Sequence, residues 1–224
     1  MSGARYALYF APEEGSALAR FGWGWLGRAP ESPELLPLPA HRAALVAEPR
    51  RYGFHGTLKP PFRLAEGTSR DELVKAAQAF AGRQRPFVEP PCVLAELHGF
   101  LALRPSLPSL SIAALADDCV RQFDRFRAPA GAEERRKRLA APLTERQRGY
   151  VEAWGYPYVF EEFRLHLTLT CRLDDAARAA CRAVLEPLAA EALAEPLVFR
   201  SLCLFEQAGT DAPFVLAARF PFAG

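Results

Sequence analysis

Two short segments of the sequence combine a histidine and a threonine in the same order, 111 positions apart. They are His55-Gly-Thr57 and His166-Leu-Thr168, in a chain of 224 residues with four histidines. A neutral imidazole can accept a proton from water, and an imidazolium can protonate a leaving oxygen. A threonine hydroxyl can donate a hydrogen bond to a phosphoryl oxygen. Two such pairs brought together suit the cleavage of a phosphodiester, a chemistry that requires no metal ion.

Neighbouring residues on the motif strands extend each pair. Side chains alternate between the two faces of a strand, so Lys59 shares the face of His55, and Arg164 and Thr170 share that of His166. Lys59 is two residues from Thr57 and Arg164 is two residues from His166, roughly 7 Å along a strand in each case. We predict that Lys59, Arg164 and Thr170 bind the substrate. Arg172, roughly 20 Å from His166 by the same rise, is too distant for direct catalysis.

Other candidates carry an alternative interpretation. Tyr52, Tyr156 and Tyr158 precede the two motif strands and are predicted to line the mouth of a cleft, although tyrosines beside strands more often serve packing. The charged segment 133–138, "EERRKR", is typical of a solvated helix face, and the alternative is a cationic lid over an anionic ligand. The two motif histidines themselves have an alternative, as core histidines hydrogen-bonded by nearby threonines.

Each motif opens the same series of elements: strand, helix, strand, turn and strand. In the first copy the strands are predicted at 52–58, 87–97 and 100–104, with a helix at 69–84. In the second copy the strands are predicted at 164–173, 197–206 and 214–220, with a helix at 174–193. Ser69, with Glu72 three residues later, is typical of a capping box. The repetition indicates an internal duplication.

This duplication predicts an α+β fold with two pseudo-twofold-related lobes, each an antiparallel sheet with helices on its outer face, around a central cleft. We predict a single domain over residues 1–224. The first motif would lie in a lobe at about 50–105, a helical insert would follow at about 106–160, and the second motif would lie in a lobe at about 161–224. The approximate twofold axis would bring two imidazoles and two hydroxyls to one place.

Net charge, apolar runs and cysteine spacing limit the classes of function that the sequence supports. The net charge of +2 gives no strong field for nucleic acid or a membrane surface. Without an apolar run long enough to cross a bilayer, and without a signal-peptide pattern, we predict a cytoplasmic protein that does not bind membranes. The five cysteines lack the spacing of metal ligands and are expected to be free thiols. We therefore expect neither a metal site nor a cofactor, and the oligomeric state is left open.

The segments "HGTL" and "HLTL" resemble the 2H phosphoesterase superfamily, which is named for its paired His-x-Thr/Ser motifs. The longer stretches "RYALYFAP", "RRYGFHGTLKPPFRL" and "GYPYVFEEFRLHLTLTCRL" look like a bacterial branch associated with phosphonate-metabolism gene clusters and often labelled as of unknown function. The resemblance implies a metal-independent reaction on 2′,3′-cyclic or similar phosphodiesters, with His55, Thr57, His166 and Thr168 as catalytic residues. It also implies a small sugar phosphate or cyclic phosphate as substrate. The long insert departs from simpler relatives.

Three functions follow as hypotheses. The leading one is a phosphoesterase that opens a cyclic phosphodiester of a small sugar phosphate or nucleotide. The second is 2′,3′-cyclic phosphate processing or ligation at RNA ends, which the near-neutral charge disfavours and the arginine-rich insert keeps open. The third is a binding module that grips a phosphorylated metabolite without turnover.

Overall fold

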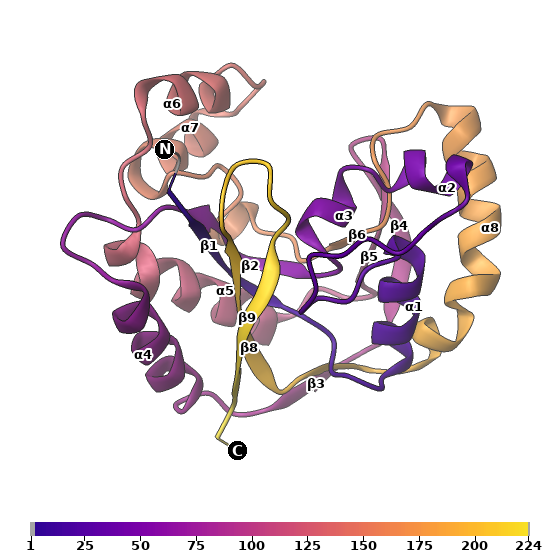
Figure 1. The fold of residues 1–224 in the computed structure, drawn as a ribbon, viewed down its shortest axis with the longest axis horizontal. Coiled ribbons are helices and arrows are strands. Elements are labelled where there is room, and N and C mark those ends of the chain that lie inside the picture. Colours follow the sequence, from indigo (N-terminus) through magenta and orange to yellow (C-terminus); the bar gives the residue numbers. More distant parts are fainter. Residues whose placement is uncertain (1–2, 224) are drawn as a thin grey trace.

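The computed structural model describes residues 3–223 and shows a mixed α+β fold built around one antiparallel sheet of seven strands (Figure 1). In spatial order the strands are β4 (Cys92–Leu97), β5 (Phe100–Pro105), β6 (Leu167–Thr168), β2 (Gly56–Phe62), β1 (Arg5–Phe10), β8 (Ser201–Gln207) and β9 (Val215–Pro221). A small second sheet pairs β3 (Phe87–Glu89) with β7 (Leu197–Phe199).

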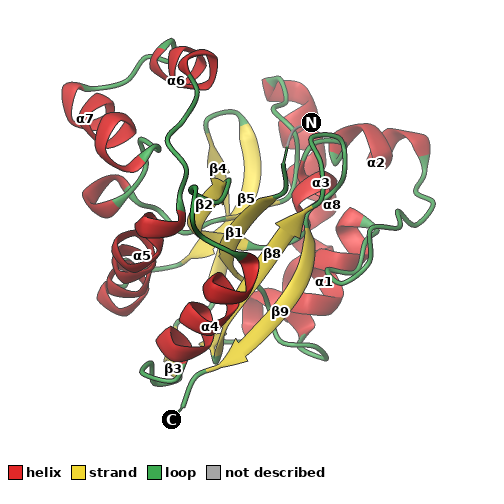
Figure 2. Ribbon diagram, turned by 60° about the vertical axis from the view of Figure 1, so that its left-hand side comes forward, coloured by secondary structure: helices red, strands yellow, loops and turns green. Residues whose placement is uncertain are grey.

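Helices flank the large sheet on opposite sides in Figure 2. They are α1 (Ala17–Leu26), α2 (Ala40–Leu45), α3 (Pro49–Tyr52), α4 (Arg70–Ala81), α5 (Leu110–Phe123), α6 (Ala132–Leu139), α7 (Glu145–Trp154) and α8 (Asp175–Ala194), with 3₁₀ turns at Asp124–Phe126 and Phe160–Glu162. Helix α4 packs on β8 and β9 at one end of the sheet, and α8 packs on β4 and β5 at the other. Helices α6 and α7 stand apart from the rest (Figure 1). None of the helices in residues 3–223 is long and apolar enough to span a membrane.

Helix α4 shows how local sequence sets an element boundary. The hydroxyl of Ser69 accepts a hydrogen bond from the backbone N–H of Glu72, and the Glu72 carboxylate accepts one from the backbone N–H of Ser69 at 2.8 Å. The predicted capping box is therefore confirmed. Leu73, Ala77 and Phe80 follow at helical spacing and are buried, so the capped helix turns one apolar face to the core.

The duplicated copies meet at two places. The motif strands β2 and β6 are neighbours at the centre of the sheet, and the small sheet pairs the corresponding strands β3 and β7. Phe87 and Phe199 are register partners there, with ring centroids 4.7 Å apart and planes at 6°. Both contacts join equivalent segments of the two copies, as an approximate twofold axis requires.

The contiguous lobe boundaries predicted at 50–105 and 161–224 do not match the halves of the sheet. Strand β5 follows the first motif in sequence but pairs with β6 of the second, with Ala102 opposite Thr168. Strand β8 follows the second motif but pairs with β1, the neighbour of β2. A strand has two hydrogen-bonding edges, and those of β2 are taken by β1 and β6. Each half of the sheet therefore takes strands from both copies.

The two motif strands also differ from their predicted lengths. Strand β2 continues through Pro60 and Pro61, because its pairing with β1 contains register shifts that accommodate residues without a donor. Strand β6 has two residues instead of the predicted 164–173. The backbone after it bonds elsewhere: Cys171 N–H donates to the Leu45 carbonyl and Leu173 N–H to the Gly99 carbonyl.

Candidate active site

The two motifs lie side by side on antiparallel neighbours. Gly56 of β2 is the register partner of Leu167 of β6. One step along this register in each direction sets each histidine opposite the threonine of the other motif, on one face of the sheet. The resulting pairs are His55 with Thr168 and Thr57 with His166. Opposite side chains in an antiparallel pair have Cβ atoms about 5 Å apart. The four side chains therefore form a compact quartet.

His55 is fixed by contacts on both ring nitrogens and on one ring face. Its Nδ1 lies 2.9 Å from the Gly53 carbonyl oxygen, which can only accept, so Nδ1 carries the proton. Its Nε2 is then the basic nitrogen, and the Thr57 hydroxyl donates to it at 3.2 Å. The imidazole stacks on Tyr9, with centroids 3.7 Å apart and planes at 18°. These contacts fix both the tautomer and the orientation of the ring.

His166 repeats the backbone contact in a different setting. Its Nδ1 donates to the Arg164 carbonyl oxygen at 2.8 Å, again the residue two positions earlier. Its nearest aromatic neighbour is Phe100, with centroids 5.8 Å apart and planes at 43°. In both imidazoles Nδ1 is bound to the backbone, so Nε2 is the nitrogen that can take part in proton transfer, although in His55 it also accepts from Thr57.

Burial makes both imidazoles weak bases. Burial lowers the pKa of His55 to about 4, against a smaller opposite effect of the Gly53 carbonyl, and the positive charges of His166 and Arg28 lower it further. Burial also lowers the pKa of His166, which the Arg164 carbonyl opposes. Both rings are thus mostly neutral at pH 7. A phosphate bound between them would raise the pKa of either ring, because nearby negative charge favours the protonated form.

A cleft of about 450 Å³ lies over the quartet. His55, Thr57 and Thr168 line it, whereas His166 does not line it and contacts the lining residue Phe100. Its charged lining residues are Arg5, Arg138, Arg172 and Glu48. This size and excess of arginine suit a small anionic molecule.

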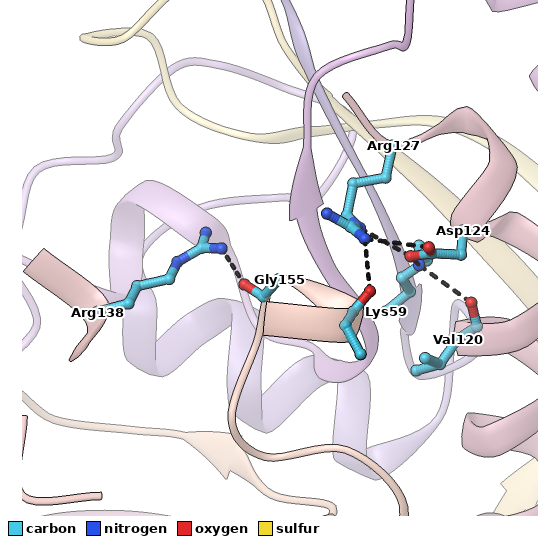
Figure 3. A network of polar contacts seen from close by, with 7 residues as sticks. Lys59, Val120, Asp124, Arg127, Arg138 and Gly155 are labelled. Atoms are coloured by element: carbon cyan, nitrogen blue, oxygen red, sulfur yellow. Dashed lines mark hydrogen bonds and ion pairs between the residues drawn. The ribbon is translucent and has the colours of Figure 1, made fainter. Parts of the chain in front are cut away.

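Lys59 does not face this cleft. Its side chain is 2 % exposed, and its ammonium donates to the Val120 carbonyl at 3.1 Å and to the Asp124 carboxylate at 3.2 Å (Figure 3). The prediction assumed regular alternation along β2, but the register with β1 shifts between Leu8 and Tyr9. This bulge turns Lys59 towards the α5 side of the sheet.

Arg164 and Thr170 also differ from their predicted roles. The Arg164 side chain is exposed, donates to two carbonyl groups of its own segment and does not line the cleft. Its backbone carbonyl, instead, holds His166. Thr170 does line the cleft, but its buried hydroxyl accepts a hydrogen bond from the Leu101 N–H at 3.0 Å.

The three predicted tyrosines have different positions. Tyr52 lines the cleft and stacks on Phe214, with centroids 5.5 Å apart. Tyr156 also lines the cleft, and burial raises its pKa. Tyr158 is 42 % exposed and outside the cleft lining, where it packs edge-on against Tyr156 at 5.6 Å.

Sequence reasoning missed four cleft residues. Tyr9 and Arg5 share one face of the first strand, a parity visible in "RYALYF". Arg138 belongs to the segment for which a cationic lid was the alternative. Arg172 was excluded by its distance from His166 along an extended strand, but the strand ends at Thr168 and the chain beyond it borders the same cleft.

Metal ligation has no obvious basis in this site. Within residues 3–223, no group of three or more histidine, cysteine, aspartate or glutamate side chains is arranged to hold a metal ion. The cysteines are all free.

The fold and the quartet define an α+β protein with a duplicated His-x-Thr motif at the centre of its sheet. The sequence profile of a family described as "Protein of unknown function (DUF1045)" matches residues 57–215. The chain belongs to this family.

Two curated proteins are similar to the chain, and both are called "Ribose 1,5-bisphosphate phosphokinase PhnN". The one from Janthinobacterium sp. (strain Marseille) is 40 % identical over 234 residues, covering 100 % of this chain and 52 % of the relative. The one from Laribacter hongkongensis (strain HLHK9) is 38 % identical over 178 residues, covering 76 % and 41 %. The chain thus spans about half the length of these relatives or less. A solved structure described as "Crystal structure of phosphoesterase" is 13 % identical, with a TM-score of 0.47 and 99 % of each chain covered.

Proposed function

We propose that this protein is a phosphoesterase that opens a cyclic phosphodiester on a small phosphorylated sugar or nucleotide. The observation that carries the proposal is the pairing of Gly56 with Leu167, whose register sets each motif histidine opposite the threonine of the other motif. A single His-x-Thr would fit a core histidine with a satisfied hydrogen bond. Two copies that meet over an arginine-lined cleft fit a phosphorus centre approached from two sides.

In this mechanism the two histidines have different roles. His55, with its pKa of about 4, stays neutral, and its Nε2 removes a proton from water as the water oxygen forms a bond to phosphorus. The bond from phosphorus to one sugar oxygen breaks, and His166, protonated in the presence of the bound phosphate, gives that oxygen its proton. Thr57 and Thr168 donate to the non-bridging oxygens as charge builds up. One water is consumed and a phosphate monoester is formed.

The relatives support a first substrate to test. Their printed name refers to ribose 1,5-bisphosphate. Opening a 1,2-cyclic phosphate of ribose 5-phosphate at its bond to O2 would leave that compound as product. This chemistry is consistent with a role in phosphonate metabolism, and the cyclic sugar phosphate belongs first in a substrate screen.

The test is hydrolysis of a panel of cyclic sugar phosphates and cyclic nucleotides in the presence of a chelator. We expect His55→Ala and His166→Ala each to lower kcat at least about a hundredfold, because each removes a proton-transfer group. His41→Ala, an exposed histidine outside the cleft, is the matched control and should retain parent activity. Activity that the two motif variants retain in full would end this assignment.

A binding module is the second candidate, favoured by the arginine-lined cleft with its two neutral imidazoles. Such a module would bind a phosphate ester tightly in calorimetry and leave it intact over hours. RNA processing would instead show RNA binding with a steep salt dependence. Turnover of small cyclic phosphates, lost in the histidine variants, would exclude a module that only binds.

A further inference from the structure

One end of the cleft carries arginines that the proposed hydrolysis does not use. Arg5 of β1 and Arg138 of α6 line the cleft there, together with Tyr156. Tyr6 is the register partner of Phe62, so its neighbour Arg5 lies towards the end of β2 that is far from the motif. The two arginines come from opposite ends of the first 140 residues, and the fold brings them to one cavity.

Arg138 is held more closely than a surface arginine. Its guanidinium donates to the Gly155 carbonyl oxygen (Figure 3). It also donates to the Glu134 carboxylate at 2.7 Å. Its side chain is 27 % exposed, against 56 % for Arg135 and 73 % for Lys137 on the same helix. Helix α6 has no buried residue of its own, so Arg138 is a side chain that ties it to the cleft.

A chain of polar contacts holds the end of α7, two residues before the Gly155 carbonyl that binds Arg138. The Arg127 guanidinium donates to both carboxylate oxygens of Asp124, at 2.7 and 3.0 Å, and to the Ala153 carbonyl at 3.1 Å. Asp124 also accepts from the buried ammonium of Lys59 on the motif strand β2. The end of α7 is therefore connected to the strand that carries His55 (Figure 3).

Gly155 connects the end of α7 to Arg138 through its carbonyl group. Its φ is +73°, a left-handed conformation that glycine adopts readily, and it ends α7. A Cβ atom at this position would lie 2.9 Å from the Arg127 guanidinium. The local backbone and the contact with Arg127 thus both require glycine where the Arg138 guanidinium is bound.

We propose that Arg138, with Arg5, binds a phosphate monoester group of the substrate, separate from the phosphodiester that the histidines cleave. The proposal rests on the proposed function and adds a substrate class: cyclic phosphates that carry a second phosphate. A guanidinium offers paired donors that match a phosphate. Glu48, the one carboxylate of residues 3–223 that lines the cleft, hydrogen-bonds through its backbone to Cys171, beyond the other motif strand. The Glu134 carboxylate that pairs with Arg138 does not line the cleft, so arginine is the charged group that the cavity wall presents at the Arg138 end.

The experiment compares adenosine 2′,3′-cyclic phosphate with the same compound bearing a 5′-phosphate. We expect Arg138→Gln to raise KM for the phosphorylated compound about tenfold or more, since a charge-assisted bond is lost. The KM for the compound without a 5′-phosphate and the kcat for both should stay within about twofold of the parent. Arg136→Gln, the same change on an exposed side chain of the same helix, is the matched control. Equal KM effects on both compounds, or no effect, would overturn the proposal.

Gly155→Ala tests the positioning. It removes no ligand group, and we expect it to reproduce the selective rise in KM by displacing Arg138. Calorimetry with ribose 1,5-bisphosphate separates the two proposals, because it needs no turnover. Binding weakened tenfold in Arg138→Gln, in a parent that hydrolyses no cyclic phosphate, would support the anion site and end the proposed function. Hydrolysis in the parent with binding unchanged in Arg138→Gln would support the proposed function and end the proposal of an anion site.

Discussion

His55 and His166 each make the same kind of hydrogen bond to the backbone, but the aromatic neighbours of the two rings differ. In both, Nδ1–H donates to the carbonyl two residues earlier. His55 is stacked on Tyr9, and burial, with smaller contributions from His166 and Arg28, lowers its pKa to about 4. His166 has a tilted Phe100 beside it. The duplicated geometry sets which nitrogen reacts, and the surroundings of each copy set how readily that nitrogen holds a proton.

The largest effect is expected in an experiment that shows which histidine is the general acid and which is the general base. With p-nitrophenyl phosphodiesters, whose leaving group departs without protonation, His166→Ala should recover to within about tenfold of the parent kcat. His55→Ala should remain at least about a hundredfold impaired, because water still needs a base. Steady-state kinetics of both variants on activated and unactivated esters provides the measurement. If His55→Ala recovers instead, His55 is the general acid and His166 is the general base.

A smaller loss is expected from the hydroxyls. Thr57→Val and Thr168→Val keep the side-chain shape and remove one donor to a non-bridging oxygen, so kcat should fall about tenfold to a hundredfold in each. Thr57→Ser and Thr168→Ser keep the donor and should stay close to the parent. If the valine variants match the serine variants in kcat, the hydroxyls have no part in the chemistry.

The pH dependence of kcat/KM is the next comparison. Since burial lowers the pKa of both free imidazoles below 6.5, both limbs of the profile should lie below pH 6.5, with the acid limb near pH 4. Tyr9→Leu removes the stacked ring and should move the acid limb upward, whereas Tyr9→Phe should leave it in place. A parent profile that still rises above pH 7 would contradict these pKa shifts.

The smallest effect concerns stability. The folded-state pKa of His55 is below its unfolded value, so the unfolded chain takes up a proton that the folded chain does not. The resulting stability is present above about pH 6.5 and is lost as pH falls towards 4, with a slope of at most about 1.4 kcal/mol per pH unit. Denaturant unfolding of the parent and of His55→Gln over this range tests it. The free energy of unfolding of the parent should decline more steeply than that of the variant, and parallel curves would refute the shift.

The sequence predicted local features better than the contacts around the site. The motif pair, the α4 capping box and the α+β class were accessible because each depends on local spacing or on repetition. Lys59 was misplaced because a bulge between β1 and β2, which no residue pattern announces, breaks the alternation of faces. Arg138 was unassigned because its position depends on Arg127 and Gly155, contacts that exist only after folding.

The exchange of strands between the copies has a consequence for how the chain folds. Strand β5 completes its pairing on β6, and β8 completes its pairing on β1, so segments far apart in sequence must dock before either end of the sheet is closed. Equivalent strands meet across the pseudo-axis as the same patch meets itself in a symmetric dimer. We therefore expect that neither half of the chain folds alone, and that the site forms together with the pairing of β2 and β6.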